Sequence, residues 1–296
     1  MNQKTKCKKC GLEIDSDLNY CPYCGTPQVE ETKDDSTQQA NESVPSNEPK
    51  ERSIKFFSFE SKAADINIFK SIAFFVIGLL GLNLLAYIFS AIAKSLDNRY
   101  FLISINSSAA INFALYLLLL GIVLIVANKD LVKCFAAFKK SKTWIQGLAF
   151  GFLLMVVSAA LNSVIQLIFP TGQNNNETGL DSITDVYPLL SLFIFGLVGP
   201  FVEEITYRIG LFGTIKKRNK IAAYLGTALV FGLIHFDFGA SNLAVEFANL
   251  PSYVVSGLLL CYFYDYGGFE VSFLAHATNN FVAVGIQILF HLVAIK

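Results

Sequence analysis

The side chains best suited to chemistry are ionisable groups inside an apolar stretch. Glu203, Glu204 and Arg208 lie in a segment long enough to cross a bilayer. Near the bilayer centre each charge costs roughly 2.5–3.5 kcal/mol, so a gain in function or packing must offset their insertion. On a helix Glu204 shares a face with Arg208, whereas Glu203 points about 100° away. We therefore predict that Glu204 and Arg208 support the helix while Glu203 faces a pocket. The alternative is a purely structural charge network.

Two histidines in other apolar segments have partners one helical turn away. Phe231 precedes His235 by four residues and Asn280 follows His276 by four, so each pair shares a helix face. Glu203 and His235 flank a basic loop at distances that differ by about 4.5 Å of helical rise, so they can lie at similar depth. We expect Glu203, His235, His276 and Asn280 to converge in the cytoplasmic half of the bilayer. The third histidine, His291, is interpreted as a packing residue.

These residues resemble the motifs of a known family, the CPBP family of intramembrane glutamic endopeptidases. This family includes prenyl-protein CAAX proteases and bacterial bacteriocin-immunity and Abi-type proteins. The resemblance covers roughly residues 185–293 and rests on three motifs in order, Glu203-Glu204-x3-Arg208, Phe231-x3-His235 and His276-x3-Asn280. Each motif alone is a weak signal, but the ordered set within a multispan protein is specific.

The resemblance implies a catalytic role for each motif residue. Glu203, acting with His235, would polarise a water for attack on a peptide carbonyl as a general base. His276 and Asn280 would donate hydrogen bonds to the developing oxyanion. Glu204, Arg208 and Phe231 would support this arrangement, and no metal is expected in the catalytic site. The implied substrate is a membrane-associated or lipidated protein or peptide.

Three other functions remain open from the sequence. A zinc-dependent intramembrane protease would use Glu203, His235 and His276 as ligands, although no H-E-x-x-H pair is present. A non-enzymatic immunity or scaffold protein, of the bacteriocin self-immunity type, would keep its function without Glu203 and His235. A transporter would have polar residues along a path across both leaflets, whereas those of this chain are clustered.

A separate metal site is predicted near the amino terminus. Cys7-x2-Cys10 and Cys21-x2-Cys24 form two zinc knuckles whose four thiolates supply a tetrahedral Zn²⁺ site. Gly11 and Gly25 directly follow the pairs and suit the tight turns of a knuckle. Two disulfides or four unliganded thiols are the alternatives. We predict a structural zinc ribbon over residues 1–27, with a possible cytoplasmic protein as its partner.

Composition separates the chain into a polar beginning and an apolar remainder. Of the 46 charged residues, 22 lie in residues 1–70 and 24 in the other 226. Residues 28–66 are predicted to be a flexible polar linker, and residues 67–296 an all-α membrane domain of about seven helices, with six to eight possible. The expected spans are roughly 68–93, 108–127, 145–169, 188–214, 221–236, 243–264 and 271–295.

Charge also indicates location and excludes one class of partner. The chain has 23 basic and 23 acidic residues, so it lacks the basic field that nucleic-acid binding requires. Lysines and an arginine concentrate after the second and fourth predicted spans, and no Lys or Arg occurs in residues 170–187. By the positive-inside rule, we expect a multi-pass cell-membrane protein with a cytoplasmic amino terminus.

Overall fold

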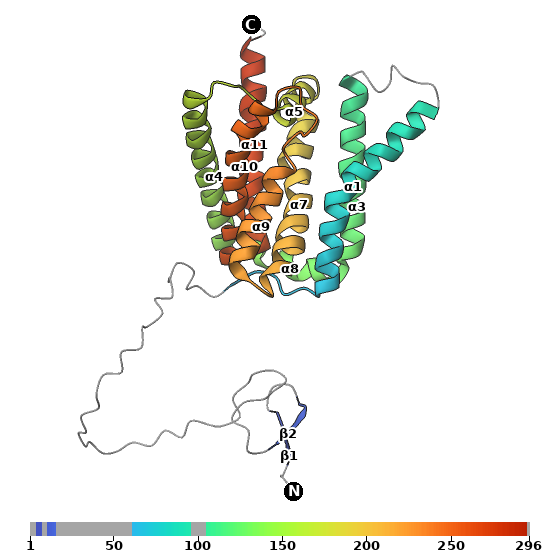
Figure 1. Cartoon of the computed structure of the whole chain (residues 1–296), viewed down its shortest axis with the longest axis vertical. Coiled ribbons are helices and arrows are strands. Elements are labelled where there is room, and N and C mark those ends of the chain that lie inside the picture. The colour runs from blue at the N-terminus through green and yellow to red at the C-terminus, as the bar shows by residue number, and fades with distance from the viewer. Residues whose placement is uncertain (1–3, 8–10, 16–60, 96–104, 295–296) are drawn as a thin grey trace, which may run out of the picture. The chain divides into compact units, whose positions relative to one another are not determined.

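The computed structural model describes residues 4–7, 11–15, 61–95 and 105–294 (Figure 1), and the chain divides into two compact units, Met1–Lys55 and Phe56–Lys296. The first unit contains the antiparallel strands β1 (Lys4–Lys6) and β2 (Glu13–Asp15), with Thr5 opposite Ile14. At the intervening turn, the Gly11 amide donates to the Cys7 carbonyl at 3.0 Å, and Gly11 has a φ of +73°, which favours glycine. The other predicted zinc ligands, Cys10, Cys21 and Cys24, lie outside the described residues.

The second unit is helical, as the sequence predicts. Among its described residues, five helical stretches are long and apolar enough to cross a membrane. Two shorter apolar stretches, Ile68–Gly81 at the start of a longer helix and Lys220–Leu233, occupy the other predicted positions. The multispan all-α class is therefore confirmed. The elements are α1 (Ile68–Ser95), α3 (Ile105–Cys134), the 3₁₀ turn η2 (Phe135–Lys139), α4 (Ser141–Ile168), α5 (Asn175–Val186), α6 (Pro188–Phe193), η3 (Ile194–Val198), α7 (Gly199–Glu203), η4 (Glu204–Phe212), α8 (Gly213–Lys216), α9 (Lys220–Leu233), α10 (Leu243–Gly267) and α11 (Phe269–Ala294).

Helix α5 lies between the third and fourth predicted spans, in residues 170–187, where no helix was predicted. Its first turn is capped by Asn174, whose side-chain oxygen accepts a hydrogen bond from the Glu177 amide at 2.9 Å. Glu177 also places a negative charge at the positive end of the helix. A Ser, Thr, Asp or Asn followed three residues later by Glu is a sequence signal for a helix start, and this segment contains it.

The fourth predicted span forms one continuous helical rod, Pro188–Lys216, in which two stretches have π-helical rather than α-helical winding. Segments η3 and η4 are π-helical, and the α-helical piece α7 lies between them. Pro200 lacks the amide hydrogen that an α-helix would use there, which is one reason for the change in helical winding. Glu203 ends α7 and Glu204 begins η4, so the acidic pair lies at the junction. π-Helical turns inside α-helices are frequent at functional sites.

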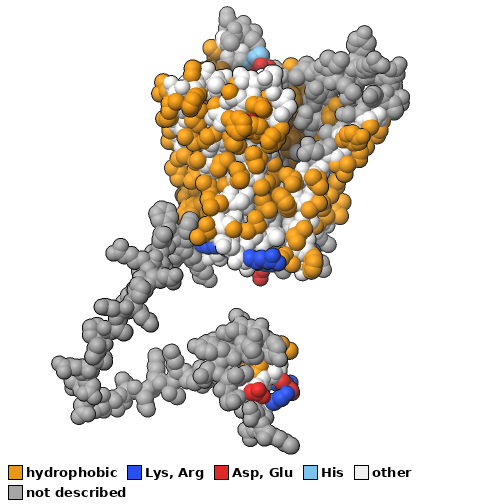
Figure 2. All heavy atoms as spheres, viewed as in Figure 1, with side chains coloured by type: hydrophobic (Ala, Val, Ile, Leu, Met, Phe, Trp, Pro, Cys, Tyr) orange, Lys and Arg blue, Asp and Glu red, His pale blue; other side chains and the backbone are white. Residues whose placement is uncertain are grey.

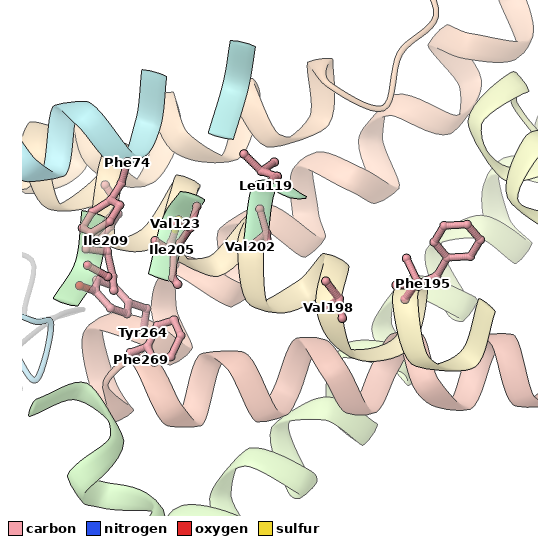
Figure 3. Close-up of a cluster of buried hydrophobic side chains, with 14 of the residues drawn as sticks. Phe74, Leu119, Val123, Phe195, Val198, Val202, Ile205, Ile209, Tyr264 and Phe269 are labelled. Atoms are coloured by element: carbon pink, nitrogen blue, oxygen red, sulfur yellow. The ribbon is translucent and has the colours of Figure 1, made fainter. Parts of the chain in front are cut away.

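This helical rod is surrounded by apolar side chains and neighbouring helices. A buried cluster that includes Val202, Ile205 and Ile209 packs this rod against α1, α3 and the start of α11 (Figure 3). Helices α4 and α11 approach closely because Gly147 faces Leu274 and Gly151 faces Thr278. Hydrophobic side chains also cover much of the outer face (Figure 2), as expected for a surface in contact with lipid.

One end of the helical unit carries a network of charged groups. The buried carboxylate of Asp265 in α10 pairs with Lys216 at 2.5 Å and Lys220 at 2.9 Å. It also accepts hydrogen bonds from Tyr224 at 3.0 Å and from Ser61 at 2.5 Å. The contact with Ser61 places the end of the predicted linker range against the helices. This network ties the chain before α1 to the junction of α8 and α9.

Candidate active site

Glu204 is the centre of a buried polar network. Its Oε1 lies 2.9 Å from Nδ1 of His276 and 3.2 Å from Nη2 of Arg208. The Ser272 hydroxyl donates to its other oxygen, Oε2. Glu204 and Arg208 have fully buried side chains, so each needs the other to compensate for lost hydration. The network therefore fixes the imidazole of His276 on α11 against the π-helical segment η4.

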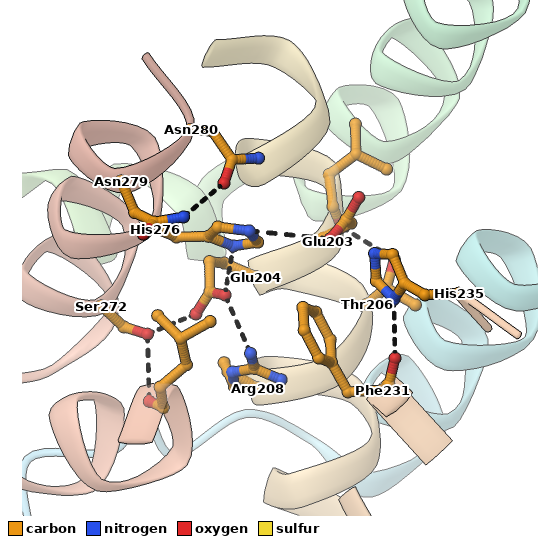
Figure 4. A network of polar contacts seen from close by, with 12 residues as sticks. Glu203, Glu204, Thr206, Arg208, Phe231, His235, Ser272, His276, Asn279 and Asn280 are labelled. Carbon is orange, nitrogen blue, oxygen red and sulfur yellow. Dashed lines mark hydrogen bonds and ion pairs between the residues drawn. The ribbon is translucent and has the colours of Figure 1, made fainter. Parts of the chain in front are cut away.

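Glu203 has a less satisfied environment than its neighbour. Its Oε2 lies 3.8 Å from Nε2 of His276, and its side chain is 19% exposed. This oxygen is buried and has no hydrogen-bond partner among the described residues. In Figure 4 the Glu203 carboxylate lies between the imidazoles of His276 and His235. A carboxylate with an unused oxygen beside two imidazoles can bind and orient a water molecule.

His235 follows the end of α9 and is fixed by contacts on two sides. Its Nδ1 lies 2.8 Å from the carbonyl oxygen of Phe231, which makes Nδ1 the protonated nitrogen and leaves Nε2 as an acceptor in the neutral ring. Its ring stacks on Tyr253, with centroids 4.4 Å apart and an angle of 14° between the planes. Its carbonyl accepts a hydrogen bond from the Asn174 side chain at 3.1 Å. These contacts define the position and tautomer of His235.

Phe231 packs among the polar groups of the site. Its ring lies under the Arg208 guanidinium, which is 4.7 Å from the ring centroid. The same ring is in contact with both imidazoles, with centroid separations of 5.0 Å to His235 and 5.8 Å to His276. Phe231 thus excludes water from the Arg208 side of the network and spaces the two histidines.

A cavity of about 620 Å³ adjoins these groups, and His235, His276, Asn280 and Phe231 line it. Glu203 is beside this wall rather than on it, which differs from the prediction that Glu203 faces the pocket. The Asn280 side-chain nitrogen donates to the Phe195 carbonyl at 3.3 Å, so one of its two hydrogens stays available.

Helix α5 forms another wall of the cavity and contacts Tyr253, the residue that stacks on His235. Glu177, which lines the cavity, accepts a hydrogen bond from the Tyr253 hydroxyl at 3.1 Å. Burial raises the pKa of the Glu177 carboxyl above its usual value, and the Tyr253 hydrogen bond opposes this rise. Tyr253 and Asn174 therefore connect α5 to His235 by two separate routes.

The structure brings the predicted site residues together and adds others. Six of the predicted residues form one contiguous cluster, namely Glu203, Glu204, Arg208, Phe231, His235 and His276. Asn280 lies one turn further along α11. Sequence reasoning missed Ser272 and Tyr253. Ser272 precedes His276 by four residues, a spacing that places both on one helix face. No local pattern identifies Tyr253, because its contact with His235 is made between two helices.

A three-ligand metal site was the competing interpretation of Glu203, His235 and His276. Within residues 4–7, 11–15, 61–95 and 105–294, no group of three His, Cys, Asp or Glu side chains has the arrangement of a metal site. His276 already contacts Glu204 through Nδ1, and His235 contacts a backbone carbonyl through the same atom. This geometry supports hydrogen bonding and proton transfer by the site.

Fold and site together define a multispan helical membrane protein with a buried glutamate–histidine centre. Residues 185–282 match the family described as "Type II CAAX prenyl endopeptidase Rce1-like", which is of the membrane protease type. This range contains all seven motif residues, so the resemblance indicated by the motifs is confirmed over this segment.

Bacterial relatives match the same chain at low to moderate identity. The chain is 30% identical over 86 residues to the UPF0177 protein YvdC of Lactococcus lactis, covering 29% of this chain and 33% of that protein. It is 25% identical over 142 residues to the UPF0177 protein YxdF of the same species, covering 46% and 72%. It is 32% identical over 91 residues to a Bacillus subtilis protein named "Putative membrane peptidase YdiL", covering 29% and 36%. The chain thus spans about a third of YvdC and of YdiL. No solved structure matches.

Proposed function

We propose that this protein is an intramembrane endopeptidase that hydrolyses a peptide bond with a water activated by Glu203 and His235. The substrate is a membrane-associated or lipidated protein or peptide. The observation that carries the proposal is the placement of Glu203, with an oxygen that has no hydrogen-bond partner among the described residues, between two oriented imidazoles. The family match over residues 185–282 supports the same class of reaction.

The proton transfers follow from the tautomers of the two histidines. Glu203 accepts a proton from the attacking water, while the unprotonated Nε2 of His235 accepts a hydrogen bond from the same water. Attack on the peptide carbonyl forms a C–O bond and places negative charge on the carbonyl oxygen. The proton held by Glu203 then passes to the leaving amine as the C–N bond breaks. Water is consumed, and an acid and an amine are formed.

Stabilisation of the oxyanion is assigned to His276 and Asn280, which line the cavity. Asn280 has one side-chain hydrogen beyond its bond to Phe195. Nδ1 of His276 faces the Glu204 carboxylate at 2.9 Å, so Nε2 is the ring nitrogen left to interact with the oxyanion. Each preorganised donor contributes on the order of 10²–10³ in rate.

A structural zinc site in the first unit is a separate proposal. Cys7 is buried against Ile14, and its amide donates to the Leu12 carbonyl at 2.9 Å across a turn that contains Gly11. A Cys followed by a tight glycine-containing turn suits a knuckle that presents thiolates to Zn²⁺. Cys7, Cys10, Cys21 and Cys24 would hold the ion, which would stabilise a unit too small to have a core of its own.

The function is tested by comparing membrane proteomes of cells that produce the wild-type protein or the Glu203→Gln variant. We expect at least one carboxyl-terminal protein fragment to appear with the wild type and to be absent with the variant. The matched control is Glu270→Gln, which alters a buried acid that accepts a hydrogen bond from the Ala137 amide outside the cavity. Fragments that persist unchanged in Glu203→Gln cells contradict the assignment of Glu203.

A further inference from the structure

The basic residues of the helical unit gather at one end. Its described Lys and Arg residues, apart from buried Arg208 and from Lys94 in the last turn of α1, lie near the start of α1, in the last turns of α3 and the connection to α4, and around the α8–α9 junction. Two contacts show that these segments lie at the same end of the unit. Lys216 of α8 pairs with Asp265 at the end of α10, and Lys217 donates to the carbonyl of Ile66, just before α1, at 2.7 Å. In Figure 2 the blue side chains of this unit lie along its lower edge.

The opposite end is built from α5, the end of α9 and the start of α10. Glu246 in α10 accepts hydrogen bonds from the Asn175 and Asp237 amides, both at 3.0 Å. Asn249 in the same helix donates to the Gly172 carbonyl at 3.0 Å. The described residues of α5, of the end of α9 and of the start of α10 include no Lys or Arg, whereas the last turn of α1 has the single Lys94. Figure 1 shows α5 and the end of α11 at the end of the unit opposite α8.

The cavity runs from the histidines toward this second end. Its inner wall is formed by Phe231, His235 and His276. Most of the remainder belongs to α5, to the middle of α10 and to the halves of α4 and α11 that are distant from the basic connections. These outer wall residues include Ser158 and Asn162 of α4, Asn176 and Asp181 of α5, and Gln287 and Phe290 of α11. The polar ones among them allow water to fill this part of the cavity.

We propose that the site receives its substrate from the extracytoplasmic side of the membrane. Clustered Lys and Arg mark the cytoplasmic ends of membrane helices, and the cavity extends toward the other end. The proposal rests on the proposed function and specifies its substrate as a peptide segment outside the cell or in the outer leaflet. Segments confined to the cytoplasm, including lipidated cytoplasmic tails, do not reach the histidines by this path.

The test is side-specific labelling of single introduced cysteines in the full-length protein in intact cells. Asn176→Cys and Ser158→Cys place thiols at the outer and inner parts of the cavity, and Lys139→Cys places one on the exposed basic end. Cells are treated with a charged, membrane-impermeant maleimide before or after permeabilisation. Modification at each position is read by mass spectrometry of its peptide, so the native cysteines can remain.

We expect modification of residues 176 and 158 in intact cells and of residue 139 only after permeabilisation. The proposal is overturned if residue 139 reacts in intact cells while 176 and 158 do not, or if neither cavity position reacts in either condition. Ser158→Cys nearly preserves side-chain volume, so its labelling tests the proposed access route even if Asn176→Cys does not accumulate. Labelling requires no turnover, so its failure is distinct from a failure of the Glu203→Gln test.

Discussion

The orientation of His235 depends on residues outside the recognised motifs. Its ring has Tyr253 on one face, and its backbone is held by Asn174. Because a general base or hydrogen-bond acceptor must meet its water within a narrow range of geometry, small movements of the ring reduce the rate strongly. Tyr253 is thus a positioning residue that acts through His235.

Replacement of Tyr253 separates stacking from hydrogen bonding. Tyr253→Phe keeps the ring against His235 and removes the hydroxyl that donates to Glu177, so we expect activity within about threefold of wild type. Tyr253→Leu removes the stack, and we expect kcat to fall on the order of tenfold to a hundredfold with little change in KM. The measurement is steady-state cleavage of a peptide from the Glu203-dependent substrate. Equal activity of the two variants contradicts the positioning role.

Glu177 gives a prediction for the pH dependence of stability. Because burial raises its pKa, the folded protein holds the proton more tightly than the unfolded chain. Its contribution to stability is therefore present at acidic pH and is lost as pH rises through the folded-state pKa. Glu177→Gln removes this dependence, so its Tm relative to wild type should increase from acidic to neutral pH. A relative Tm that decreases over this interval contradicts the raised pKa.

For individual residues, the sequence predicted which motif side chains share a helix face. The Glu204–Arg208 pair and the His276–Asn280 turn follow from i,i+4 spacing. The contact of Glu204 with His276 and the stack of Tyr253 on His235 were not predictable in this way. They depend on how α10 and α11 pack against other helices, which periodicity does not define.

Among the helices, a close approach that supports the site lies between α4 and α11. A Cβ added at Gly151 would lie 2.5 Å from the Cβ of Thr278 and 2.8 Å from the carbonyl oxygen of Ala275. Since α11 carries His276 and Asn280, separation of these helices would also widen the cavity. Small residues at such contacts allow membrane helices to pack closely.

Gly151→Ala is expected to lower stability by about 1–3 kcal/mol because the added methyl group overpacks the interface. The matched control is Gly285→Ala on α11, where no other described atom lies within 4 Å of the added Cβ. This control should keep or raise stability by up to about 1 kcal/mol, because alanine favours helix. Thermal unfolding in detergent measures both variants. Equal destabilisation would contradict the close α4–α11 contact.

Helix positions were predicted from apolar length, and the seven predicted stretches all contain helix. Two features of the elements were not predicted. Helix α5 was missed because its apolar residues are few, although its Asn174 cap and Glu177 signal were present. The π-helical segments were missed because periodicity over a long apolar run does not show a local change in winding.

For the whole chain, we predict that zinc binding belongs to the first unit and catalysis to the second. If Cys7, Cys10, Cys21 and Cys24 hold one structural zinc, the purified full-length protein contains about one zinc per chain. Replacement of all four by serine should reduce this to about zero while Glu203-dependent cleavage persists. Elemental analysis of both proteins checks this prediction. One zinc remaining in the serine variant indicates a metal at the histidine site instead.

The most direct test of the central claim uses the purified full-length protein in lipid vesicles with a peptide from its identified substrate. The account predicts that Glu203→Gln lowers kcat by at least about 10²-fold. It also predicts that the Tm is unchanged or higher, because the substitution removes a buried carboxylate oxygen that lacks a hydrogen-bond partner among the described residues. Cleavage by Glu203→Gln at the wild-type rate would contradict the account.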